Sequence, residues 1–284
     1  MSRKFTISEG LESGIAMVRL GWRRSGLVLA LMAVAATMFN GLQNQAGMAL
    51  AAGASFAVYI VLGLAASGAL FRLASLPSEH LRAEEVGAGG LQWRSTEWTL
   101  LRLSAFYFGL FLVLAIVLAA IAAVLFRSSG VDISVLQKLA DPVQGEAVLM
   151  ANPALARSIG LVFIIGLVLY CVFIWAAIRL SLVTVDTAVS GKVRPFHAWP
   201  LTKGHFWRIF GGLLVIALPS ILLSMVVGAL DARSVASGNA GLSAQGIWAM
   251  AGATGLLTAF VITPMQIGFT AEAYRKLSVA SADR

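Results

Sequence analysis

Charged side chains are scarce in this chain, and their absence from long stretches argues against a soluble globular protein. Charged residues make up 12% of the 284 positions, whereas soluble domains carry about 25%. A membrane-spanning helix needs about 20 mainly apolar residues, and five intervals without any charge are long enough to supply one. These intervals are 25–71, 103–126, 158–178, 209–230 and 234–271, with 47, 24, 21, 22 and 38 residues.

The five intervals predict six membrane-spanning helices. The first interval is interrupted by the polar string FNGLQNQAG (39–47), so we expect it to hold two helices. The last interval begins with the Ser- and Gly-rich string SVASGNAGLSAQ, which leaves room for one helix. The expected fold class is an all-α integral membrane protein with a single membrane domain over 1–284. Its predicted spans lie near 26–42, 48–70, 103–126, 158–178, 209–229 and 247–270.

Cysteine is nearly absent, and no histidine or cysteine spacing is typical of a metal site. The one cysteine, Cys171, excludes an intramolecular disulfide, and we expect its thiol to pack as a small apolar group in the fourth span. A catalytic interpretation would need His197 or His205 as a general base, oriented by Asp186. No motif fixes that geometry, so we expect neither an enzyme nor a metal or cofactor.

Basic residues are distributed unevenly between the segments that connect the predicted helices. With the N-terminus inside, the cytoplasmic segments carry 17 of the 21 Lys and Arg residues and the whole formal charge of +8. Cytoplasmic loops are enriched in these residues, so both termini are predicted to be cytoplasmic. Because this basicity reflects topology, we expect no nucleic-acid partner. Arg outnumbers Lys by 16 to five, which fits a GC-rich bacterial genome and therefore a bacterial inner membrane.

A Trp-Arg dipeptide precedes each outward-going helix, and a similar Arg-containing string follows each returning one. The exit strings are FRLAS (71–75), IRLSL (178–182) and YRKLS (274–278). The pattern predicts three helical hairpins, at about 5–75, 76–190 and 191–278. Either an internal repeat or independent anchoring explains it, because Trp and Arg both favour the headgroup level. The predicted interfacial anchors are Trp22, Arg23, Arg72, Trp93, Arg94, Arg179 and Arg275.

Amphipathic cytoplasmic elbow helices are predicted to join these hairpins. TISE (6–9) has the spacing of a capping box. Apolar residues then recur along one face of a helix, and we expect this apolar stripe to lie on the inner membrane surface. The second elbow runs from Pro77 to GAGG (87–90), and in the outer loop 127–157 Asn152-Pro153 is expected to restart a helix. The residues of the stripe are Leu11, Ile15, Val18 and Trp22.

The third elbow is the segment RPFHAWPLTKGHFWRIF (194–210), which combines basic and aromatic residues. Thr202 is expected to cap a helix that begins near Lys203. Basic pockets between helices on the cytoplasmic side bind anionic headgroups, and ordinary positive-inside anchoring is the alternative. The predicted lipid-headgroup residues are Arg194, Lys203, His205, Trp207 and Arg208.

The string AWPLTKGHFWR (198–208), followed by an apolar helix, resembles a motif in bacterial multi-pass membrane proteins of uncharacterised function. These include the membrane domain that some glycerophosphoryl diester phosphodiesterases carry. The resemblance extends over 175–276 and implies a helical inner-membrane domain without catalytic residues. The soluble barrel of the phosphodiesterase has no counterpart, because no stretch here is long or polar enough to encode it.

Two prolines lie at similar depth in the last two predicted spans and could form a hinge. Pro219 and Pro264 are each about 15 Å from the inner interface at 1.5 Å per residue. Proline-interrupted helices near the midplane often mark transporter sites, although prolines are also tolerated as simple bends. Thr258, Thr263 and Gln266 would supply a polar lining. No charged residue lies deep in a predicted span, which disfavours proton-coupled transport.

The leading hypothesis is a non-catalytic membrane module that uses its basic cytoplasmic face. The expected partners are anionic membrane lipids, together with either a membrane-protein partner or a second copy of this chain. The alternative hypothesis is a transporter or flippase-like carrier of a lipid or small amphiphile, which would work through the Pro-kinked third hairpin.

Overall fold

The structure is a computed structural model that describes residues 5–43, 45, 47–75, 88–128, 150–236 and 242–282. Every regular element in these ranges is helical, as predicted for the fold class. The long helices are α1 (Ile7–Leu42), α2 (Ala49–Ser75), α3 (Ser95–Ser128), α6 (Pro153–Ser190), α7 (Phe206–Ala236), α8 (Ala244–Leu257) and α9 (Thr263–Ala282). Short turns of helix lie at Ala88–Gly90, Pro200–Thr202 and Thr258–Ile262.

The prediction of six apolar helices is confirmed. Six helical stretches in the described residues are long and apolar enough to cross a membrane, as in a multi-pass membrane protein. Most extend beyond the predicted spans, and α6 begins at Pro153 as the Asn152-Pro153 pair predicted. The six stretches are Ile7–Leu42, Ala49–Ser75, Ser95–Arg127, Pro153–Ser190, Phe206–Ser234 and Ala244–Val279.

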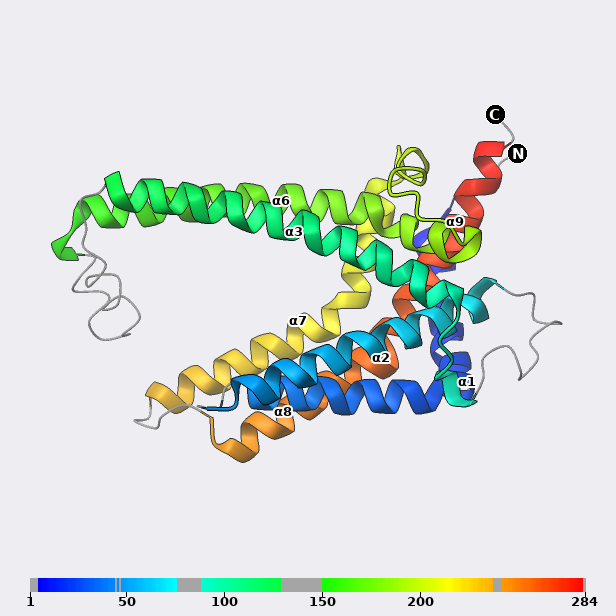
Figure 1. Cartoon of the computed structure of the whole chain (residues 1–284), viewed down its shortest axis with the longest axis horizontal. Coiled ribbons are helices and arrows are strands. Elements are labelled where there is room, and N and C mark those ends of the chain that lie inside the picture. Colours follow the sequence, from blue (N-terminus) through cyan, green and yellow to red (C-terminus); the bar gives the residue numbers. More distant parts are fainter. Residues whose placement is uncertain are drawn as a thin grey trace. The chain divides into compact units, whose positions relative to one another are not determined.

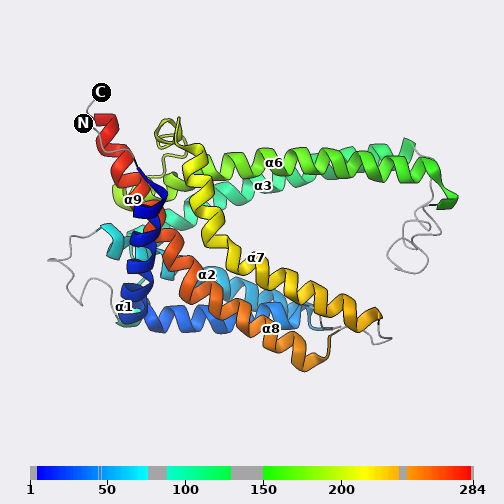
Figure 2. The same cartoon turned by 180° about the vertical axis from the view of Figure 1, so that it is seen from behind.

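The chain divides into two compact units. Unit 1 comprises Met1–Leu103 and Ile178–Arg284, and unit 2 comprises Ser104–Ala177. In unit 2, α3 and α6 run side by side in Figures 1 and 2. Phe111 and Phe173 pack edge to face with ring centroids 5.8 Å apart, and the Ser158 hydroxyl donates to the Leu125 carbonyl at 3.4 Å.

Helix α1 begins with the predicted capping box and is kinked at Ser25. The Thr6 side chain accepts from the Glu9 amide, and the Glu9 carboxylate accepts from the Thr6 amide. At Ser25 the backbone leaves the helical region (φ −124°, ψ 18°), and kinks are common at Ser-Gly pairs such as Ser25-Gly26. The residues predicted as the first elbow and the first span therefore belong to one helix with a kink between them. Figure 1 shows this bend in the blue helix.

Glycines on α1 and α9 let the two backbones approach closely. A Cβ on Gly268 would lie 2.7 Å from the Ser13 carbonyl oxygen and 2.9 Å from the Gly14 Cα. The Ser13 hydroxyl donates to the Gly268 carbonyl at 3.2 Å. Small residues of this kind are typical of helix contacts in membranes.

The face of α1 that packs against the other helices of unit 1 is therefore not the predicted apolar stripe. Gly10, Gly14 and Met17 are buried, whereas Ile15 and Trp22 of that stripe are 47% and 52% exposed. The stripe remains available to a membrane surface, and the glycine face makes the protein contacts.

The last apolar stretch is interrupted by a π-helical turn, Thr258–Ile262, between α8 and α9. In an α-helix the carbonyl of Phe260 would accept from the amide of residue 264, but Pro264 has no N–H. The Trp22 indole instead donates to the Phe260 carbonyl at 2.6 Å. The Phe260 carbonyl, which lacks its helical donor at this interruption, thus accepts a hydrogen bond from α1, close to the α1 kink.

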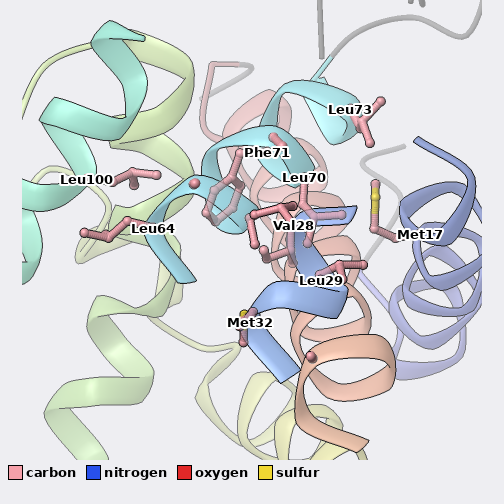
Figure 3. Packing of buried hydrophobic residues seen from close by; sticks show 14 of the residues in the cluster. Met17, Val28, Leu29, Met32, Leu64, Leu70, Phe71, Leu73 and Leu100 are labelled. Carbon is pink, nitrogen blue, oxygen red and sulfur yellow. The ribbon is translucent and has the colours of Figure 1, made fainter. Parts of the chain in front are cut away.

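A cluster of buried apolar side chains fills the space between α1 and α2 in unit 1. Figure 3 shows Val28, Leu29 and Leu70 at its centre, all fully buried. Ala259 and Ile267 extend the cluster to the last apolar stretch. Helix α9 lies beside the first part of α1, and α8 beside the second part, in Figures 1 and 2. The candidate sites lie at the two ends of unit 1, and this packing holds the helices that form them.

Candidate functional site

A cavity of about 400 Å³ lies in unit 1 between α1, the C-terminal part of α2, the C-terminal part of α6, and α9. Its walls include the apolar side chains of Met17, Leu20 and Phe71. Small-molecule sites in proteins have volumes of about 300–1,000 Å³ and mostly apolar walls with a few polar groups. The cavity therefore has the size and lining of a ligand site.

Polar and charged groups lie along the α9 side of this cavity. The Arg275 guanidinium donates to the Glu272 carboxylate at 2.6 Å, and both residues line the cavity. The Arg275 side chain is 72% exposed, so it reaches solvent or a headgroup layer. One residue further on, the Lys276 ammonium lies 3.1 Å from the Glu9 carboxylate at the start of α1.

Asp186 joins the cavity to the 194–210 segment. The Tyr274 hydroxyl, which lines the cavity, donates to Asp186 Oδ1 at 2.6 Å. His197 Nδ1 lies 3.2 Å from Asp186 Oδ2, and the Asp186 side chain is 4% exposed. No sequence motif predicted this contact between His197 and Asp186. The segment that follows α6 turns back over it, so residues eleven positions apart in sequence meet.

The segment 194–210 is folded by local contacts that differ from the predicted cap. Thr202 is buried in the turn Pro200–Thr202, and its hydroxyl donates to the Trp199 carbonyl at 2.8 Å. Thr202 therefore does not cap a helix at Lys203, and α7 begins at Phe206 after Gly204, whose φ is +80°. The Arg179 guanidinium lies 5.5 Å from the centre of the Trp199 ring, within cation–π range.

The predicted headgroup residues have different environments. Arg194 and Lys203 are exposed, and Trp207 is 76% exposed. Arg208 Nη1 donates to the Phe5 carbonyl at 2.8 Å, so this arginine ties the start of the described chain to α7. His205 is half-buried at the start of α7, and its carbonyl accepts from the Ile209 amide.

The predicted interfacial anchors also make distinct contacts. The Arg72 guanidinium pairs with the Glu97 carboxylate, which is fully buried and also accepts from the Arg94 amide at 2.7 Å. Trp93 packs edge to face on Trp98 with centroids 5.8 Å apart. The tryptophans of the three Trp-Arg pairs are all exposed, and each packs edge to face on another aromatic ring. They differ in that the Trp22 indole also donates to the Phe260 carbonyl.

The two predicted hinge prolines differ in burial. Pro264 is buried and faces Gly21 of α1, where an added Cβ would lie 3.7 Å from the proline Cβ. Pro219 is exposed within α7. Pro264 therefore packs against α1 close to the α1 kink at Ser25. No sequence pattern predicted α1 as the partner of this proline.

The comparisons with known proteins add no relative to this geometry. No protein-family model, no curated protein and no solved structure matches the chain. Within the described ranges, no group of three or more His, Cys, Asp or Glu residues is placed to hold a metal ion.

Proposed function

We propose that this protein is a non-catalytic polytopic membrane module that binds an anionic lipid at its basic, cytoplasmic end. The observation that carries the proposal is the cavity of about 400 Å³ with apolar walls and Arg275 beside it. An acyl chain would occupy the space among Met17, Leu20 and Phe71, and the headgroup would lie near Arg275.

The charge on this end of the helices supports an anionic headgroup. A guanidinium has five N–H donors, so Arg275 retains donors for a phosphate while one nitrogen bonds Glu272. Arg194 and Lys203 are exposed and add positive charge to the predicted cytoplasmic surface. The bias of basic residues toward the predicted inner segments supports a bacterial inner-membrane location with both termini in the cytoplasm.

Native mass spectrometry of protein released gently from its own membrane tests the proposal. The Ala271→Phe variant fills the cavity, and Ala229→Phe makes the same change at an exposed position of α7 outside the cavity lining. We expect a phospholipid adduct in the wild type and in Ala229→Phe, and its loss in Ala271→Phe. Arg275→Gln should lower the anionic share of the bound lipid.

Equal lipid occupancy in Ala271→Phe and the wild type, at unchanged melting temperature, would overturn the cavity assignment. A folded Ala271→Phe variant is needed for this test, and circular dichroism establishes it. If Arg275→Gln binds the same mixture of lipids as the wild type, the headgroup does not lie at Arg275, and the anionic preference loses its support.

A second candidate function, a lipid or amphiphile carrier, is favoured by the adjacent interruptions of α1 at Ser25 and of the last stretch at Pro264. Interrupted helices are typical of transporter sites, and here Trp22, a predicted interfacial anchor, bonds the Phe260 carbonyl of the interrupted stretch. A fluorescent-phospholipid scrambling assay in vesicles measures the flux. We expect Pro219→Ala and Pro264→Ala to abolish it, and wild-type flux in both variants would eliminate the carrier.

A further inference from the structure

Two adjoining cavities lie at the opposite end of unit 1 from the proposed lipid site. They have volumes of about 530 Å³ and 240 Å³ and share the side chains of Asn40 and Thr254. The larger is lined by the ends of α1 and α7, by Leu242 and by α8, and the smaller lies between α1, α2 and the last apolar stretch as far as Thr258. We call the two together the funnel, with the larger cavity as its mouth and the smaller as its base.

The funnel is lined by hydrogen-bonding side chains in otherwise apolar helices. Gln43 and Ser224 line the mouth, Thr258 lines the base, and Asn40 and Thr254 line both. Polar groups that face hydrocarbon without partners are costly, and polar residues inside membrane bundles usually face a cavity or a neighbouring helix. The gathering of amides and hydroxyls around one cavity therefore indicates a space that admits water or a polar ligand.

The base of the funnel combines aromatic rings with the interruption of the last stretch. Phe39 and Tyr59 line it, and Phe39 packs on Phe56 with centroids 4.9 Å apart. Thr258 is the first residue of the π-helical turn, and such turns occur frequently at functional sites. The faces of aromatic rings carry negative charge density and attract organic cations.

The electrostatics of the mouth also favour a cation. Asp231 lines the mouth, and its Oδ1 accepts from the Leu242 amide at 2.9 Å, which fixes the carboxylate in place. Among the described residues that line the funnel, none is Lys, Arg or His. The carboxylate at the mouth and the aromatic rings at the base would therefore each attract a positively charged ligand.

We propose that the funnel binds a small organic ammonium compound. Its charged group would pass Asp231 and reach Phe39 and Tyr59, and its polar substituents would bond Asn40 and Thr254. The funnel shares no lining residue with the cavity beside Arg275, so this inference stands independently of the lipid-binding proposal.

Thiol-labelling kinetics test the charge preference directly. The single native cysteine makes Cys171→Ser a clean background, in which Met250→Cys, at an apolar lining position, reports on the funnel and Met48→Cys on an exposed turn at the same end. The probes are two thiosulfonates of similar size, one with a trimethylammonium group and one with a sulfonate. We expect the cation-to-anion rate ratio at Met250→Cys to exceed that at Met48→Cys by about tenfold, because Asp231 attracts the cation and repels the anion. Asp231→Asn should remove this difference.

Protection experiments then test binding rather than access. Choline, ethanolamine and tetramethylammonium should each slow labelling of Met250→Cys, whereas 3,3-dimethylbutanol, the neutral analogue of choline, should not. Equal rate ratios at both cysteines, or protection by none of the three ammonium probes, would overturn the proposal. Equal protection by choline and its neutral analogue would show a polar site without cation selectivity, which also contradicts it.

Discussion

Helices α1 and α3 are both long and apolar enough to span a membrane, but they differ in how much of their surface is buried within the protein. In the most apolar 18-residue stretch of α3 no residue is buried, whereas 44% of the corresponding stretch of α1 is buried. The α3 stretch is nevertheless the most apolar of the six, and the α1 stretch is among the least. The burial of side chains in this protein therefore does not follow their hydropathy.

The difference follows from the solvent that each helix is built to face. Lipid tails are as apolar as leucine, so apolar side chains gain little by leaving lipid for a protein contact. Besides its cluster of apolar side chains, unit 1 has close backbone approach at Gly14 and Gly268, the buried Arg72–Glu97 pair and the Trp22 bond to Phe260. Unit 2 exposes large side chains such as Phe163 and Phe108, at 70% and 65%.

The largest expected effect comes from breaking the buried ion pair of unit 1. Glu97→Ala leaves the Arg72 guanidinium without its carboxylate, and we expect a loss of about 3–5 kcal/mol in the free energy of unfolding. The control is Arg275→Ala, which removes the 72% exposed partner of Glu272 and leaves that carboxylate beside Lys276 at 3.9 Å, so it should cost below about 1 kcal/mol. Detergent-induced unfolding followed by circular dichroism measures both, and equal costs would refute the special role of the buried pair.

A glycine substitution compares the two units most directly. Gly268→Leu would push a side chain into the backbone of α1, and overpacking of this kind costs about 1–3 kcal/mol or more. Gly160→Leu makes the same change in unit 2, where nothing lies within 4 Å of an added Cβ. We expect Gly160→Leu to be neutral or stabilising by up to about 1 kcal/mol. Similar melting temperatures for the two variants would contradict close packing at Gly268.

The Trp22 bond to Phe260 should contribute less, and a double-mutant cycle isolates it. Trp22→Phe keeps an aromatic ring, although a smaller one than the indole, and removes the N–H donor, and we expect a cost of about 0.5–1.5 kcal/mol. In a Pro264→Ala background, the amide of residue 264 replaces the indole as donor to Phe260. Trp22→Phe should then cost almost nothing, and an undiminished cost there would show that ring packing alone matters.

The smallest effect is expected on the exposed face of unit 2. Phe163→Ala should change the free energy of unfolding by no more than about 0.5 kcal/mol, because the side chain loses few protein contacts. The same unfolding measurement applies. A cost above about 2 kcal/mol would mean that a second copy or another protein covers this face in the purified state.

Much of the fold was predictable because charge-free length and helix caps are local signals. The six apolar helices, the capping box at Thr6 and the start of α6 at Pro153 each depend on a few neighbouring residues. The pairing of α1 with α9 was not predictable, although Gly10 and Gly14 have the spacing of close-packing helices. Gly14 lies against Gly268 and Gly10 against the Phe269 ring, and both partners are more than 250 residues away in the sequence.

The candidate sites show the same limit. Thr258 was predicted to line a site at Pro219 and Pro264, but it lies at the base of the funnel, among residues of α1, α2 and α8. His197, Asp186 and Tyr274 were visible separately, but only the fold brings a loop, α6 and α9 together. The kink at Ser25 has a local signal in the Ser25-Gly26 pair. This pair indicates a kink less strongly than a proline does, so the sequence alone did not predict one here. Two further predicted features, most of the second elbow and of the outer loop, lie in residues 76–87 and 129–149, outside the described ranges.

The bond between Trp22 and Phe260 has a consequence for biosynthesis. Its two partners are 238 residues apart, and ribosomes add about 5–20 residues per second. The first helix therefore waits roughly 12–48 s in the membrane before the last helix can cover its glycine face. During that interval the nascent protein presents an unpaired helix surface to insertion chaperones and membrane proteases, so the rate at which the final helix is delivered helps to set the yield of folded protein.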